Sequence, residues 1–469
     1  MVDRPAFSAS PHTIERGLWR AELGATLRLS WPLALANLLQ MLVHAIDVIF
    51  VARLGESELA ASSLAIAIFG LVLWGLSGLT GAVAPLIAAE LGSRRHSVRE
   101  VRRSVRMALW LAAGAGLGGM LVCLQGERLM LATGQDPKIA AMAGSFMAII
   151  VFALIPSIIA NVLRIFVSTL NRPIFATIII ASAILVSILA NWALVFGNLG
   201  LPALGLRGSA MASVLTSIYI MFAYIAAIAW DRRLRRYRIF GNWWRTEWSR
   251  MQEIIRIGAP IMLTIIAEAG LFSGAAFLMG RIGPSELAGH TIALQVAALA
   301  FQIPFGIGQA ATIRVGYHYG ARDRAAMGRA GWAALGIAVA FSMVTASIML
   351  FAPHLVLSIY VDVYAAKNVA MVGFAVQFLL WAAIFQLVDA TQAVAAGSLR
   401  GLQDTRMPMV IAIVSYWAAG FSVAIALAFY TPLSGVGVWI GLAAGLLVAS
   451  LLLTFRWYRR EQLGLTRTD

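Results

Sequence analysis

The chain has 469 residues, of which 61% are hydrophobic and only 12% are charged, so it is too apolar for a soluble domain of this size. Its net charge of +15 does not indicate nucleic-acid binding, because nearly all of its positive residues are arginines in short loops between apolar runs. The single cysteine, Cys123, excludes an intrachain disulfide. Continuous rather than alternating apolar runs predict an all-α membrane protein.

Twelve apolar spans follow a polar, basic segment, 1–29, which lacks the apolar core of a cleavable signal peptide. Each is long enough to cross about 30 Å of hydrocarbon. The spans are expected near 30–52, 62–88, 106–126, 139–163, 174–196, 208–230, 255–279, 288–312, 331–353, 370–396, 408–429 and 434–456. The first six form an N-lobe (30–230), a basic linker (231–254) leads to a C-lobe (255–456), and 457–469 form a tail.

Arginine is concentrated in alternate loops, among them 93–106, 231–250 and 399–406. By the positive-inside rule, these loops and both termini are cytoplasmic, and the expected location is a bacterial inner membrane. Tryptophans among the arginines of the linker, at Trp243, Trp244 and Trp248, indicate a helix at headgroup level. A solvated basic linker is the equally weighted alternative.

The two lobes are related by a shift of 228 positions, which places Pro32 on Pro260 without a gap. The same shift aligns the tetrapeptide 57–60 with 285–288, and Gly92 with Gly320. Since each unit has six spans, both units start on the same side of the membrane. We therefore predict two six-helix lobes related by a parallel pseudo-two-fold axis, with a substrate path between them.

Three carboxylates, Asp47, Glu268 and Asp389, lie deep inside the expected spans. An ionised carboxylate in hydrocarbon is unfavourable by several kcal/mol unless it faces a cavity or a partner, so such acids indicate an ion or proton site. Gln386 and Gln392 lie one turn before and after Asp389, on the same helix face. Two close carboxylates repel each other, and a bound cation or proton relieves that repulsion. A structural hydrogen-bond clamp between helices is the alternative.

Further polar residues lie within the spans. His44, one turn before Asp47, is expected to be a hydrogen-bonded packing residue, and Gln295, Gln302 and Gln309 add polarity to the eighth span. For Arg164, Arg314 and Arg400, near cytoplasmic ends, we expect snorkelling or helix capping. The chain has no P-loop, HExxH or GxSxG motif, which argues against an enzyme.

Several segments together resemble the multidrug and toxin extrusion (MATE) family, in its NorM-type bacterial branch. They are AIDVIFVARLG (45–55), AEAGLFSGAAFLMGRIGPSELAGHTIALQ (267–295), IRVGYHYG (313–320), VDATQAVAAGSLRG (388–401) and SYW (415–417). The resemblance spans residues 25–458. It implies twelve helices in two lobes that open alternately, and export of lipophilic, aromatic cations in exchange for Na⁺ or H⁺.

The resemblance also assigns roles to residues. The family's cation-site acids match Glu268 and Asp389, its first-lobe acid matches Asp47, and its helix-5 asparagine matches Asn191. Phe385 stands where relatives often carry a tyrosine. The expected neighbourhood of substrate and ion comprises Phe385, Gln386, Gln392, Gln295, Asn191, His44 and Tyr416.

The coupling ion is expected to be Na⁺ at Glu268 and Asp389, with H⁺-only coupling as the alternative. No cofactor is expected. The expected partners are cationic drugs and the lipid bilayer, without nucleic acid, and the protein is expected to be a monomer. One rival is a flippase for lipid-linked intermediates, which needs a cationic cavity, whereas the deep charges of this sequence are acidic. A membrane-embedded enzyme and a channel are weaker rivals.

Overall fold

The computed structural model describes residues 11–93 and 97–466, and every regular element in these ranges is helical. The helices of the first lobe are α1 (Pro11–Ala52), α2 (Glu56–Gly81), α3 (Val83–Ser93), α4 (Ser97–Leu124), α5 (Gly126–Ala132), α6 (Pro137–Ile150), η1 (Val151–Ala153), α7 (Leu154–Thr169), α8 (Ile174–Phe196) and α9 (Leu206–Trp230). After the short α10 (Arg232–Arg235), the second lobe contains α11 (Trp248–Ile282), α12 (Pro284–Gly320), α13 (Arg324–Phe351), α14 (Pro353–Leu357), η2 (Ala366–Asn368), α15 (Val369–Gly401), α16 (Arg406–Ile413), η3 (Val414–Phe421), α17 (Ser422–Phe429) and α18 (Ser434–Tyr458).

These helices make twelve candidate membrane spans in the described part of the chain, as the sequence predicts. The first span begins much earlier than expected, because α1 runs without a break from Pro11. Conversely, Ala82 interrupts the second span and separates α2 from α3. In the eleventh span, η3 is a π-helix between α16 and α17, a local irregularity that apolar periodicity does not reveal.

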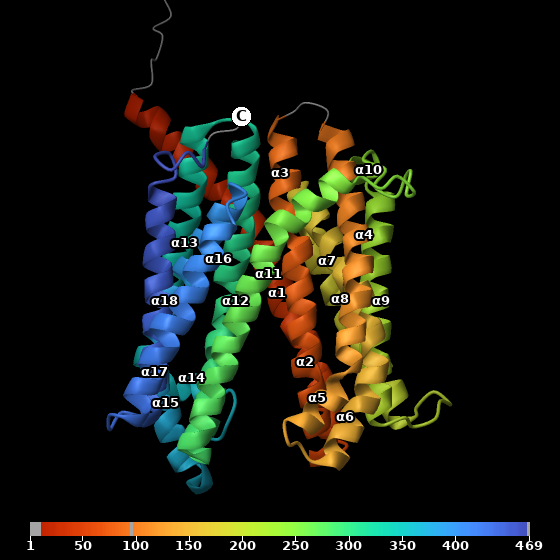
Figure 1. Cartoon of the computed structure of the whole chain (residues 1–469), viewed down its shortest axis with the longest axis vertical. Coiled ribbons are helices and arrows are strands. Elements are labelled where there is room, and N and C mark those ends of the chain that lie inside the picture. The colour runs from red at the N-terminus through yellow and green to blue at the C-terminus, as the bar shows by residue number, and fades with distance from the viewer. Residues whose placement is uncertain (1–10, 94–96, 467–469) are drawn as a thin grey trace, which may run out of the picture.

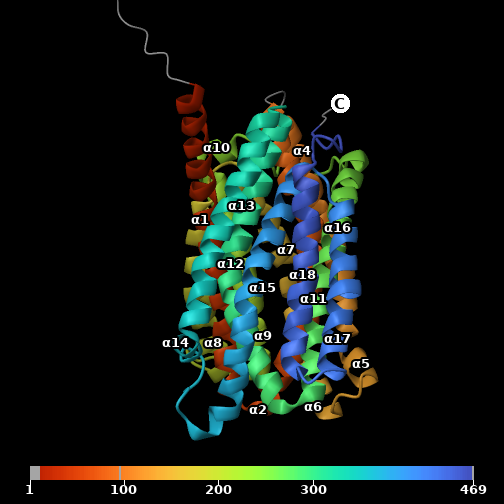
Figure 2. The same cartoon turned by 90° about the vertical axis from the view of Figure 1, so that its left-hand side faces the viewer.

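The spans form two bundles, and the linker lies at the same end of the molecule as the start of α1 and the end of α18 (Figure 1). Each bundle has its own apolar core, one around Phe146 and Phe166 and another around Phe378 and Trp439, and the start of α11 joins the first core through Ile254, Ile257 and Ile261. Turning the molecule places α13, α15 and α18 of the C-lobe in front (Figure 2). The predicted two-lobe architecture is therefore confirmed.

The contacts between the lobes repeat the shift of 228 positions. Gly92 of α3 packs on the backbone of Tyr317 in α12, and Gly320 of α12 packs in the same way on Ala89 of α3. The shift of 228 positions carries Gly92 onto Gly320 and Ala89 onto Tyr317, so each contact is the other with the two lobes exchanged. A glycine is required at both places because a Cβ atom would overlap a backbone carbonyl. These paired contacts place the pseudo-two-fold axis between α3 and α12.

The first helix of each lobe also reaches the opposite lobe. In α1, Glu22 accepts hydrogen bonds from Arg314 of α12 at 2.7 and 2.8 Å and lies 3.4 Å from His318. In α11, Arg250 lies 2.8 Å from Glu90 of α3. The shift of 228 positions carries Glu22 onto Arg250 and Glu90 onto His318. The two contacts therefore occupy equivalent positions, with the acidic and the basic residue exchanged.

Most of the linker packs on the N-lobe. Glu247 pairs with Arg103 and Arg106 of α4, and the ring of Trp243 stacks on Trp110 at 5.7 Å between centroids. The described linker has no single helix across its three tryptophans, because α10 covers only Arg232–Arg235, Trp243 and Trp244 lie in turns, and Trp248 is the first residue of α11. Trp243 is withdrawn from the surface by its contact with α4, whereas Trp244 remains exposed.

The contacts that join the lobes lie toward the end that carries the linker. They include Gly258 of α11 on Leu79, Gly306 of α12 on Ala34, and the glycine and ion-pair contacts between α1, α3, α11 and α12. Toward the opposite end, α2 and α11 diverge (Figure 1). The molecule is therefore held closed at the arginine-rich end.

Candidate functional site

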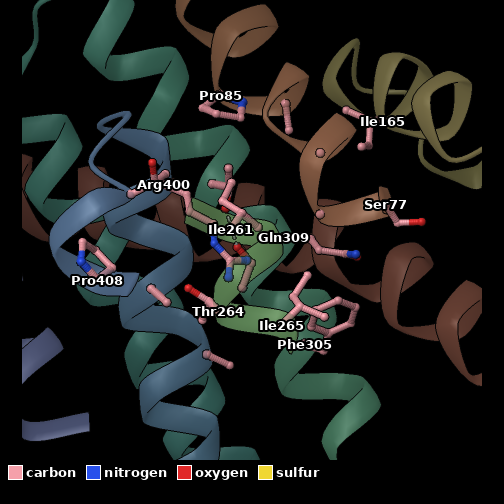
Figure 3. A pocket seen from close by; sticks show the side chains of 18 of the residues that line it. Ser77, Pro85, Ile165, Ile261, Thr264, Ile265, Phe305, Gln309, Arg400 and Pro408 are labelled. Carbon is pink, nitrogen blue, oxygen red and sulfur yellow. Dashed lines mark hydrogen bonds between the residues drawn. The ribbon is translucent and has the colours of Figure 1, made fainter. Parts of the chain in front are cut away.

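A central cavity of about 210 Å³ lies between the lobes. In Figure 3, Ser77 and Ile165 of the N-lobe stand on one side of it, and Arg400, Thr264 and Phe305 of the C-lobe on the other. Most of its wall is apolar or aromatic, and its charged lining residues among the described part of the chain are Glu268, Arg164 and Arg400. A pocket of this kind suits a largely apolar ligand that carries a few charges.

The C-lobe acids come together behind this wall. Glu268 of α11 lines the cavity, and Asp389 of α15, 4% exposed, is close enough to interact with it electrostatically. Tyr416 of η3 is fully buried and interacts with both acids, and it accepts a hydrogen bond from Gln392. The structure thus unites two acids on different helices that the sequence could only place in the same lobe.

The same region contains oxygen atoms without protein partners. Asp389 Oδ1, Gln386 Oε1 and Gln392 Oε1 are buried and accept no hydrogen bond from the described residues. Buried acceptors are normally satisfied, by water or an ion if not by protein. A hard cation needs several such oxygens, so this donor set fits Na⁺, and either acid alone fits a proton. No group of three His, Cys, Asp or Glu side chains forms a metal site in the described ranges.

Phe385 does not face the central cavity. Its ring lies edge-on to Phe272 at 6.0 Å and to Trp439 at 5.7 Å, and its side chain is 2% exposed. Phe385 therefore packs beside Asp389 as part of the lobe core. Gln295 of α12 is exposed and lines neither cavity, so its expected place in the site is wrong. Its turn of α12 faces outward, a direction that residue type alone does not determine.

Asp47 belongs to a second cavity, of about 480 Å³, which the N-lobe lines except for Gln302 of α12. Asn191 donates a hydrogen bond to Asp47 Oδ1 at 2.7 Å, as does Ser187 at 3.1 Å, and Ser213 donates to Oδ2 at 2.8 Å. His44 lies close enough to Asp47 to interact electrostatically. These donors surround an acid in the opposite lobe from Glu268 and Asp389, so the three predicted acids form two sites.

Arg164 of α7 lines both cavities, together with Asn161, Trp74 and Ser77. Its guanidinium donates to Asn37 Oδ1 at 3.1 Å and to Asn161 Oδ1 at 3.0 Å. Asn37 in turn donates to Gln309 of the C-lobe at 3.4 Å. This polar chain crosses between the lobes.

The expectation that the three arginines snorkel or cap helices is wrong for Arg164 and Arg400, which point into protein, and for Arg314, which pairs with Glu22. The sequence did contain a signal for Arg164. Under the shift of 228 positions, Arg164 and Asn161 occupy the places of Gln392 and Asp389. The N-lobe therefore carries a cation where the C-lobe carries its polar and acidic pair.

Comparison with known proteins gives a consistent result. The MatE family model matches residues 32–193 and 260–426. The chain is 43% identical to "Probable multidrug resistance protein NorM" of Mesorhizobium japonicum (strain LMG 29417 / CECT 9101 / MAFF 303099) over 95% of this chain and 96% of the relative. It is 42% identical to the protein of the same name from Brucella suis biovar 1, over 94% of each.

Solved structures show the same fold. A eukaryotic MATE transporter, AtDTX14, is 20% identical with a TM-score of 0.85, covering 96% of this chain and 98% of that one. A MATE protein in a straight conformation is 21% identical with a TM-score of 0.84 and the same coverage. At these identities the likeness concerns the arrangement of helices.

Proposed function

This chain belongs to the MatE family, a family of transporters rather than enzymes, and we propose that it is a multidrug efflux antiporter of a bacterial inner membrane. It exports lipophilic, aromatic cations and takes up Na⁺ in exchange. The transport path is the central cavity, and the two lobes open it alternately to either side. Both termini and the linker lie in the cytoplasm, because the arginine-rich loops are on that side.

The observation that carries this proposal is the position of Glu268. Its side chain lines an apolar cavity shared by both lobes, and the buried Asp389 is close enough to interact with it electrostatically. A cationic drug is attracted strongly to a carboxylate where water is sparse. A cation bound between Glu268 and Asp389 removes that attraction, so ion and drug compete for the same charge.

The closed arginine-rich end indicates which state this is. The contacts of Gly92, Gly320 and Glu22 seal the cytoplasmic side, and the helices diverge on the other. We assign the structure to the outward-facing state, in which the drug leaves and the ion enters.

The energetics set a limit on coupling. A tenfold ion gradient supplies about 1.4 kcal/mol, and one charge moved through 100 mV supplies about 2.3 kcal/mol. Exchange of one Na⁺ for one monovalent cation cancels the voltage contribution and leaves roughly a tenfold drug gradient. Exchange of two ions for each drug molecule restores the voltage contribution.

The test uses purified protein in proteoliposomes, at equal pH on both faces, with an imposed Na⁺ gradient and ethidium as substrate. Ethidium movement is expected to follow the Na⁺ gradient, and Glu268→Gln and Asp389→Asn are expected to abolish it while leaving folded protein in the membrane. If only a pH gradient drives transport, and Na⁺ neither drives nor inhibits it, the two acids form a proton site. If the variants lose folding but keep transport per molecule, the acids are structural.

A second candidate is supported by a specific observation. The central cavity presents Arg164 and Arg400, so the deep charges are not all acidic, contrary to what the sequence indicated. Two arginines suit the phosphates of a lipid-linked intermediate, as a flippase requires. The flippase predicts ion-independent movement of a short-chain pyrophosphate lipid in the same proteoliposomes, and no movement of ethidium.

A further inference from the structure

The linker between the lobes presents a row of arginines on its surface. These residues, which we call the basic face, are Arg232, Arg233, Arg235, Arg236, Arg238 and Arg245, and all of them are exposed. None of their side chains forms an ion pair or a hydrogen bond with any residue that the structure describes. The basic face therefore carries charge that no contact within the described chain neutralises.

The two carboxylates of the same stretch are already paired with the N-lobe. Asp231 lies 3.4 Å from Arg172 in the turn between α7 and α8. Glu247 pairs with Arg103 and Arg106 of α4. The acids thus attach the linker to the N-lobe, and the arginines between them remain available to a partner from outside.

Buried side chains hold the basic face in place. Leu234, Tyr237 and Ile239 are buried and belong to the N-lobe core, where the ring of Tyr237 lies edge-on to Phe166 at 5.7 Å between centroids. These three residues alternate with the exposed arginines along 232–239. One side of the segment is therefore anchored in protein and the opposite side is basic, so the arginines are presented on a fixed scaffold.

The basic face starts where a membrane span ends. Trp230 is the last residue of α9 and its side chain is 88% exposed. Arg232 follows two residues later, and α10 lies beside the ends of α4 and α9 (Figure 1). Trp244, also within the linker, is 86% exposed. Exposed tryptophan at the end of a span, with arginine next to it, is typical of protein at the level of the lipid headgroups.

We propose that the basic face, together with Trp230 and Trp244, binds anionic phospholipid headgroups of the leaflet at the arginine-rich end. A guanidinium forms two parallel hydrogen bonds with a phosphate, and clustered basic residues beside a span are attracted to an anionic membrane surface. Both ends of the linker continue into spans, α9 and α11, so the basic face is held at the bilayer surface. The proposal concerns the linker alone and does not depend on the export function.

The test measures lipid binding to the purified full-length protein in detergent by native mass spectrometry. Dioleoylphosphatidylglycerol is compared with dioleoylphosphatidylcholine, which has the same acyl chains and a phosphate but no net charge. Wild-type protein is expected to bind phosphatidylglycerol at least about tenfold more tightly. Arg232→Gln combined with Arg235→Gln removes two cations one turn apart. It is expected to weaken phosphatidylglycerol binding roughly 10- to 30-fold and to leave phosphatidylcholine binding nearly unchanged.

Two matched variants separate this effect from loss of folding and from general loss of charge. Arg322→Gln combined with Arg324→Gln removes two exposed arginines from the connection between α12 and α13, and is expected to change neither lipid. Arg232→Lys combined with Arg235→Lys keeps both charges and is expected to recover most of the phosphatidylglycerol binding. Unchanged phosphatidylcholine binding and an unchanged melting temperature show that each variant is folded.

A photoactivatable phosphatidylglycerol in liposomes locates the contact in a bilayer. Crosslinks are expected on peptides from 230–246, and fewer of them in the Arg232→Gln, Arg235→Gln protein. Equal affinity for the two lipids, an equal loss in the Arg322→Gln, Arg324→Gln protein, or crosslinks that spare 230–246 would overturn the proposal. Binding of sn-glycerol 1-phosphate as tight as that of phosphatidylglycerol would indicate a site for soluble phosphates and would overturn it as well.

Discussion

An alanine at Gly92 or Gly320 is expected to open the arginine-rich end of the transporter, the end proposed to face the cytoplasm. An added Cβ at Gly320 would lie 2.7 Å from Ala89 Cα, and one at Gly92 would lie 2.9 Å from the Ala321 nitrogen. Ordinary contacts of a Cβ atom begin at 3.4 Å. Because the opposing atoms are backbone of the other lobe, no side chain can move aside, and the lobes themselves must separate.

The magnitude follows from where the clash occurs. Overpacking a tight contact costs roughly 1–3 kcal/mol. The clash exists only while the lobes touch at this end, so this free energy acts on the equilibrium between the two states. A shift of roughly 5- to 150-fold toward the state open to the cytoplasm is therefore expected.

The assay is a distance measurement between spin labels at Arg99→Cys and Arg324→Cys, which lie on exposed first turns of α4 and α13 in opposite lobes. The native Cys123 is buried and should not react. Both alanine variants are expected to move population from the short to the long distance. Gly336→Ala is the control, since nothing lies within 4 Å of its added Cβ.

Two results would refute the reasoning. Folded Gly92→Ala and Gly320→Ala proteins with wild-type distance distributions would show that the contact does not hold the lobes together. An effect at one glycine and not the other would contradict the pseudo-two-fold equivalence of the two contacts.

Three further predictions concern other parts of the chain. Asp47→Asn keeps the shape of the side chain and is expected to slow coupled export without loss of folded protein, measured as dye efflux per molecule in everted vesicles; unchanged efflux would make Asp47 structural. Glu22→Gln is expected to favour the cytoplasm-open state by roughly 150-fold or more, since breaking a largely buried ion pair costs roughly 3–5 kcal/mol, and the charge-swapped pair Glu22→Arg with Arg314→Glu should restore closure in the same spin-label assay. Alkaline phosphatase fused after residue 240 is expected to be inactive, and fused after residue 203 active; the reverse would overturn the orientation.

The spans and the repeat could be predicted from sequence because both depend on one-dimensional patterns. Apolar run length gives the number of spans, and the alignment of Gly92 with Gly320 anticipates the paired glycine contacts found between the lobes. The start of α1 at Pro11 could not be read in this way, because its first turns are polar and no apolar run marks them.

The site was predictable in its acids and not in its arginines. Glu268 and Asp389 are conspicuous because a carboxylate is unusual in an apolar run. Arg164 lies close enough to a helix end to snorkel, and only the tertiary structure shows that its side chain turns inward to Asn37 and Asn161. The prediction that Gln295 belongs to the site was wrong, because a polar residue on an apolar helix can face either the cavity or the outside.

In the contact of Glu22 with His318 and that of Arg250 with Glu90, the acidic and the basic residue are exchanged between the halves. This exchange affects how the halves recognise each other. Glu22 meets His318 and Arg250 meets Glu90, always across the boundary between unlike halves. If two copies of the first half met in the same geometry, Glu22 would face Glu90, and two copies of the second half would set Arg250 against His318. Two carboxylates would repel each other in the first homodimer, and in the second Arg250 and His318 would both lack the carboxylate that each contacts here. The two halves, expressed as separate chains, are therefore expected to assemble as heterodimers in preference to either self-pairing.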